Sequence, residues 1–93
     1  MSATFHLAVP AGDLAATEKF YVDILGCETG NREEGRWVDI NFWGNELTLH
    51  QSQESLPSVR HDVDMGNVEV PHFGAPLSES DFQALKGRLA AAD

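Results

Sequence analysis

The sequence has 93 residues, 42% hydrophobic and 23% charged, which predicts one small globular domain rather than a disordered chain. Six basic and fifteen acidic residues give a net charge of −9, which disfavours nucleic acid and anionic membrane surfaces as partners. No run approaches the ~20 apolar residues of a membrane span, and the first residues lack the pattern of a signal peptide. We therefore expect a cytoplasmic protein, in which the one cysteine, Cys27, stays reduced.

The first part of the chain predicts a strand, a helix and a second strand. Residues 4–9 alternate between apolar and other side chains, as in a half-buried strand. Asp13 is a good N-cap for a helix over 14–25, where apolar residues recur four apart, and Gly26 is placed to close that helix. A short strand over 27–29 follows.

Two further strands complete a βαβββ order. A polar segment over 31–35 predicts a turn. Apolar and polar residues then alternate strongly over 36–43 and 46–51, and Gly44 with Asn45 predicts the hairpin turn between these two strands.

The remainder of the chain predicts a long connection, a strand and a helix. Residues 52–67 are polar and without periodicity, which indicates a linker between modules or a loop over a site. Residues 68–75 predict a strand. Ser78 then begins a helix with apolar spacing that continues to Ala92.

A short repeat suggests how these parts are organised. HLAVP, beginning at His6, and HFGAP, beginning at His72, share the form His-x-small-x-Pro and lie 66 residues apart, although chance is an alternative for so short a match. We predict an α+β fold with a βαβββ module over 1–51, a linker over 52–67, and the strand and helix of a second module over 68–93. We expect this second module to lack its last strands.

Side-chain parity divides the predicted strands into two faces, because successive strand residues point to opposite sides. The apolar positions should pack under the helix: Phe5, Leu7, Val9, Val38, Ile40, Phe42, Leu47 and Leu49. His6 and His50 fall on the opposite face, and His72 lies in the later strand.

These three histidines predict a metal site. Imidazole is a common ligand of borderline divalent metals, so His6, His50 and His72 could bind one ion if their strands converge, with Asp39 or Glu46 orienting a ring. The alternative is an ordinary wet sheet face on which histidine has no function. The same face supplies the candidates for a substrate pocket: Trp37, Asp39, Asn41 and Thr48. No catalytic residue is assigned.

The segment FHLAVPAGDLAATEKFYVDILGCETG resembles the opening βαβββ unit of the vicinal-oxygen-chelate superfamily of glyoxalases, bleomycin-resistance proteins and extradiol dioxygenases. VPHFGAPLSESDFQAL resembles the start of its second unit. The resemblance implies two units around a cavity and a divalent metal (Fe, Mn, Zn or Ni), held by a His, a residue late in the first unit, a second His and a Glu. His6 and His72 match the first and third ligands, His50 is the candidate for the second, and the Glu has no counterpart in these residues.

Three hypotheses follow. The first is a metal-dependent enzyme, a lyase, isomerase or ring-cleaving oxygenase, in which the ion acts as a Lewis acid on a small-molecule substrate. The second is a metal-free protein that binds or sequesters small molecules in a cleft lined by Trp37 and Trp43. The third is an inactive chain whose open strand edges pair with a second copy. Under all three we expect a homodimer or higher homo-oligomer.

Overall fold

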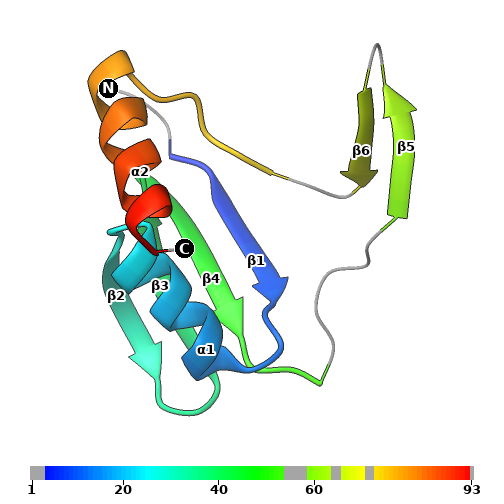
Figure 1. Ribbon diagram of the computed structural model, residues 1–93. Helices are drawn as coiled ribbons and strands as arrows, with labels where there is room; N and C mark the ends of the chain where they lie inside the picture. Colours follow the sequence, from blue (N-terminus) through cyan, green and yellow to red (C-terminus); the bar gives the residue numbers. More distant parts are fainter. Residues whose placement is uncertain (1–3, 54–58, 64–65, 71–72, 93) are drawn as a thin grey trace.

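A computed structural model describes residues 4–53, 59–63, 66–70 and 73–92 (Figure 1). Its elements in chain order are β1 (His6–Pro10), α1 (Leu14–Lys19), the π-helical turn η1 (Phe20–Ile24), β2 (Glu28–Glu33), β3 (Trp37–Phe42), β4 (Asn45–His50), β5 (Val59–Val63), β6 (Gly66–Val70) and α2 (Glu79–Ala92). The predicted α+β class and the βαβββ order of the first part are confirmed. The predicted domain boundaries stay predictions.

The first four strands form one mixed sheet in the order β1-β4-β3-β2. β1 runs parallel to β4, and β3 is antiparallel to both of its neighbours. Because β1 and β4 are paired in register, His6 lies opposite Glu46 at one end and Pro10 lies opposite His50 at the other. This register decides which polar side chains meet on the open face.

The core lies between this sheet and the helical segment formed by α1 and η1 (Figure 1). Its buried apolar residues are Val9, Leu14, Cys27, Val38, Ile40, Leu47 and Leu49. The predicted apolar parity class supplies five of them, so the assignment of faces is confirmed, except that Phe5 is 64% exposed. On the opposite face His6, Ala8 and His50 are exposed, which leaves that side of the sheet open.

The helix begins where the sequence predicts but changes form after Lys19. The Asp13 side chain accepts a hydrogen bond from the Ala15 amide, as expected of an N-cap. From Phe20 the bonding widens, and the Leu25 amide donates to the Phe20 carbonyl at 3.1 Å. The prediction of a regular helix over 14–25 is therefore wrong in its last turn. Gly26 has a φ of +80° and ends the helix as predicted.

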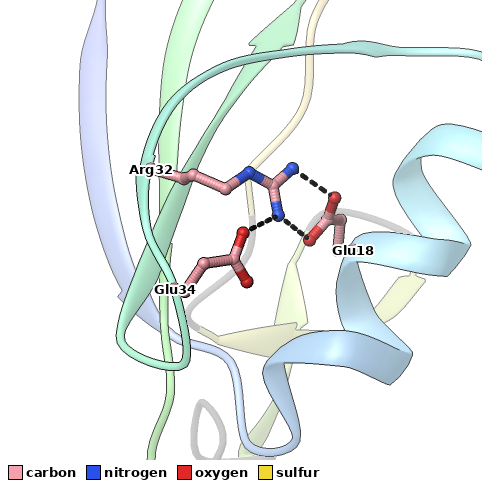
Figure 2. Close-up of polar contacts among 3 residues, drawn as sticks. All are labelled: Glu18, Arg32 and Glu34. Atoms are coloured by element: carbon pink, nitrogen blue, oxygen red, sulfur yellow. Dashed lines mark hydrogen bonds and ion pairs between the residues drawn. The ribbon is translucent and has the colours of Figure 1, made fainter.

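The second strand is longer than expected. The polar segment predicted as a turn continues β2 to Glu33, and the register shifts between Thr29 and Arg32. This bulge places Arg32 beside α1, where its guanidinium donates hydrogen bonds of 3.1 and 2.7 Å to Glu18 and lies 3.5 Å from Glu34 (Figure 2). The hydrogen bonds with Glu18 raise the pKa of Arg32 above its ordinary value.

The β3–β4 hairpin turns one residue earlier than predicted. Trp43 and Gly44 have φ values of 48° and 88°, and Asn45 is already the first residue of β4. The Asn41 carboxamide oxygen accepts a hydrogen bond from the Gly44 amide at 2.8 Å. Two consecutive residues with positive φ suit the twist of a tight hairpin, and here a tryptophan occupies the first position.

The second half of the chain contains a separate hairpin. β5 and β6 pair with each other in a two-stranded antiparallel sheet, which Figure 1 shows apart from the first sheet. β5 lies in the segment predicted as a linker without strands. β6 begins two residues before the predicted 68–75 strand and ends at Val70, while residues 73–75 are not in a strand. Apolar residues are too sparse in VRHDV to produce a periodic signal.

The last helix is confirmed and contacts the first module. The Ser78 hydroxyl accepts a hydrogen bond from the Asp81 amide, which caps α2. The Arg88 guanidinium donates to the carbonyls of Asp23 and Ile24, both at 3.0 Å, so α2 is joined to the end of η1. None of the helices in the described residues has the length and apolar character that a bilayer crossing requires.

Candidate functional site

His6 and Glu46 form a pair of potential metal ligands on the open face. They lie opposite each other on β1 and β4, and His6 Nδ1 is 2.9 Å from Glu46 Oε1. Both side chains are more than half exposed, at 58% and 54%, so a ligand can reach them from solvent. The parallel register places this imidazole and this carboxylate together.

His50 occupies the same face at the other end of the strands. It lies four residues after Glu46 along β4, which at ~3.3 Å per residue places the two positions ~13 Å apart. Its neighbours across the sheet are Pro10 on β1 and Trp37 on β3. The structure therefore does not bring His50 to His6.

The third predicted ligand, His72, lies outside the described residues. Within the ranges that the structure describes, no three His, Cys, Asp or Glu side chains are grouped so that they could hold one ion. The three-histidine site thus stays a prediction.

A cleft of about 430 Å³ lies next to the His6–Glu46 pair, within the size range of small-molecule sites. Its lining residues come from β2, β3, the start of β4, the β3–β4 turn and the residue Thr4: Thr4, Glu28, Thr29, Gly30, Asn31, Asp39, Ile40, Asn41, Gly44, Asn45 and Glu46. Two of the four predicted pocket residues, Asp39 and Asn41, are among them. Glu46 belongs to both the cleft and the ligand pair.

Asp39 is held in place by a buried hydroxyl. Thr48, 7% exposed, donates a hydrogen bond of 2.7 Å from Oγ1 to Asp39 Oδ1. Thr48 thus supports the cleft from the neighbouring strand without lining it. Asp39 keeps its second oxygen for a ligand, because a carboxylate has two acceptor atoms.

Trp37 lies away from this cleft. Its indole Nε1 donates to Glu33 at 3.1 Å, and its ring lines a smaller hollow of about 210 Å³ near the start of α1. Trp43 borders another hollow of about 230 Å³ beside Cys27, whose thiol pKa is raised by burial against an opposing effect of Arg88. The aromatic residues predicted to stack on a ligand are therefore not part of the main cleft.

Sequence reasoning gave Glu46 only a supporting role and did not single out Glu28. Parity placed Glu46 and His50 in one class, and nothing in that pattern tells which of them faces His6. The missing information is the parallel pairing of β1 with β4, because the sheet order is a tertiary property.

Neither a scan against family models nor a search of curated proteins gives a match. Solved structures do match. The glyoxalase/bleomycin resistance protein/dioxygenase from Alicyclobacillus acidocaldarius has a TM-score of 0.72 and 30% identity, over 97% of this chain and 63% of that one. This chain is therefore similar to a solved protein of the glyoxalase, bleomycin-resistance and dioxygenase superfamily.

Two further solved structures resemble this chain. A lactoylglutathione lyase from Agrobacterium tumefaciens has a TM-score of 0.58 and 28% identity over 99% of this chain and 71% of its own. An integron cassette protein from a Halifax Harbour sewage outfall has a TM-score of 0.68 at 22% identity, over 99% and 72%, and supports the fold alone. The chain thus spans less than two thirds of the Alicyclobacillus protein and somewhat more of the other two.

Proposed function

We propose that this chain belongs to the glyoxalase, bleomycin-resistance and dioxygenase superfamily and is a metal-dependent enzyme acting on a small molecule, a lyase, isomerase or ring-cleaving oxygenase. We place a divalent ion (Fe, Mn, Zn or Ni) at His6 and Glu46. The observation that carries the proposal is the 2.9 Å separation of His6 Nδ1 and Glu46 Oε1 at the border of the cleft. Two atoms that bind one ion at ~2.1 Å and at right angles to each other are ~3.0 Å apart, so the pair fits two adjacent coordination positions.

The donor chemistry of the pair also suits such an ion. An imidazole and a carboxylate are ligands for zinc and for non-haem iron, and open positions on the ion leave room for substrate. The sequence still makes His72 the candidate for a third ligand. A bound divalent ion would supply Lewis acidity beside the cleft.

The residues of the cleft would orient the substrate. Asp39, fixed by Thr48, presents a carboxylate in a constant position. Asn41 uses its carboxamide oxygen for the Gly44 amide, which directs its NH2 group away from that turn and makes it a donor for a substrate oxygen. Orientation by fixed hydrogen-bonding groups lowers the entropic barrier of the bound reaction.

Metal binding by single-site variants tests the proposal. Chelator-stripped protein is dialysed against Zn²⁺, Ni²⁺, Mn²⁺ or anaerobic Fe²⁺, and bound metal is measured by atomic emission and calorimetry. We expect H6A and E46Q to weaken binding at least about tenfold, since each removes a ligand. H50A is the matched control and should bind as the wild type does.

Two results would contradict the assignment. Wild-type protein that binds none of the four ions after reconstitution would remove the metal site. A loss in H50A equal to that in H6A would restore His50 as a ligand in place of Glu46. The variants change exposed side chains, and circular dichroism checks that each is folded.

The metal-free alternative depended on an aromatic cleft. Trp37 and Trp43 border separate hollows, and none of the residues that line the 430 Å³ cleft is aromatic. No observation on the described residues therefore favours sequestration over metal-assisted chemistry. Binding of a small molecule to metal-stripped protein would support sequestration.

A further inference from the structure

An apolar stripe on α2 is left uncovered by the described residues. Phe82, Leu85 and Leu89 recur at helical spacing along it, and Phe82 and Leu89 are 51% and 43% exposed. None of the described residues of α2 is buried, although the helix has 14 residues. Arg88 joins the helix to η1 by hydrogen bonds, so this attachment does not use the stripe.

A mainly apolar hollow of about 230 Å³, which we call the apolar groove, lies close to the start of α2. Five of its eight lining residues are apolar: Phe5, Leu7, Leu47, Phe73 and Pro76. Phe73 and Pro76 belong to the segment that leads into α2 (Figure 1). A cavity of ~150 Å³ holds a benzene molecule, so the apolar groove has room for a phenylalanine ring. Phe82 of the same chain does not line it.

The exposed apolar side chains share one side of the sheet. Phe5 and Leu7 have the parity of the core residue Val9, and the Phe73 ring lies 5.7 Å from that of Phe42, which packs against the core. The helix α2 contacts η1 on this same side. The large exposed apolar side chains of the described residues therefore all belong to the helical side: Phe5, Phe20, Phe73, Phe82 and Leu89.

The exposed area of the whole chain matches what a dimer needs to cover. The chain exposes 6843 Å², whereas a compact monomer of 10.2 kDa exposes about 5,300 Å². The excess is about 1,500 Å², and an obligate homodimer buries ~1,000–2,500 Å² of each partner. Two chains that each carry a net charge of −9 repel each other, so their contact has to be apolar.

We propose that the helical side of this chain binds a second copy of itself, with Phe82 of each copy inserted into the apolar groove of the other. Leu85 and Leu89 extend the contact along α2. A two-fold axis makes every contact reciprocal, so one arrangement fills both grooves and covers both stripes. This interface does not depend on the metal site or the activity proposed above.

Contacts between copies test the proposal directly. An equimolar mixture of 13C-labelled and unlabelled protein in EDTA is examined by isotope-filtered NOE spectroscopy, which detects only contacts between the two copies. We expect NOEs from the Phe82 ring of the unlabelled copy to the Leu7 and Leu47 methyl groups of the labelled one. EDTA removes any metal ion that could bridge two chains. Absence of these NOEs in a sample that sedimentation shows to be dimeric would overturn the proposal.

Matched variants measure the strength of the contact by sedimentation equilibrium. F82A should raise the dimer dissociation constant at least about a hundredfold, because each dimer buries two copies of this ring. F20A removes the same ring from η1, outside the groove lining, and should leave the constant unchanged. Added salt should tighten the dimer, because it screens the repulsion between the two chains.

Three results of these measurements would also overturn the proposal: equal effects of F82A and F20A, a dimer that weakens as salt is added, or single chains at every concentration. Phe82 and Phe20 are both exposed, and circular dichroism checks that each variant is folded.

Discussion

At the scale of single residues, Gly26 joins two features of the fold. Its φ of +80° is a conformation that side chains rarely adopt, and a Cβ there would lie 3.0 Å from the Arg88 guanidinium. Gly12 has a similar φ of +68°, with nothing within 4 Å of its Cβ position. A substitution at Gly12 therefore adds backbone strain alone, whereas a substitution at Gly26 adds the same strain and a contact with Arg88 on α2.

We predict that G12A lowers the free energy of unfolding by about 1 kcal/mol and that G26A lowers it by about 1–2 kcal/mol. The additional loss in G26A arises because Arg88 must leave the carbonyls of Asp23 and Ile24. Urea denaturation of G12A and G26A, each alone and combined with R88A, measures these changes in the free energy of unfolding. A difference between G26A and G12A that persists in the R88A background would contradict this explanation.

At the scale of elements, the sequence was sufficient to predict helices and strands wherever local chemistry determines them. Alternation identified β1, β3 and β4 and assigned their faces, and Asp13, Gly26 and Ser78 marked the helix ends. It failed where distant contacts decide. β2 extends to Glu33, and a bulge in it brings Arg32 to Glu18 on α1 (Figure 2). The residues ETGNRE show no periodicity from which this distant contact could be predicted.

The attachment of α2 gives a prediction at this scale. Arg88 supplies two hydrogen bonds to the end of η1, and none of the residues of α2 in the described range is buried. R88A should therefore speed amide hydrogen exchange throughout α2 while leaving β3 and β4 protected. K86A, on the same helix, is the control for loss of one positive charge. Unchanged exchange in R88A would show that other contacts hold the helix.

At the scale of the whole molecule, the chain is more extended than a compact domain. Its radius of gyration is 14.3 Å, whereas about 12 Å is expected for 93 residues. Large apolar side chains are exposed on both halves, among them Phe5 at 64%, Phe82 at 51% and Leu89 at 43%. Association with a second copy would cover such surface.

We therefore predict a homodimer. Light scattering coupled to size exclusion should give about twice the chain mass of 10.2 kDa at micromolar concentration and lower values on dilution. F82S combined with L89S should shift the equilibrium toward single chains, because it removes apolar surface from α2. A mass of one chain at every concentration would refute the prediction.

The candidate site shows the same division between local and distant information. The sequence identified the polar face and placed His6, Asp39 and Asn41 on it, since parity is a local property. It could not choose between Glu46 and His50 as the partner of His6, because that choice follows from the parallel pairing of β1 with β4.

Paramagnetic line broadening by substoichiometric Mn²⁺ tests the location of the metal most directly, because the effect falls steeply with distance from the ion. In 15N-labelled protein, the account predicts that the amide signals of His6, Glu46 and Asn41 are lost first and that the His50 and Trp37 signals, at the far end of the same strands, persist longest. Broadening centred on His50, or spread evenly over the acidic surface, would contradict it.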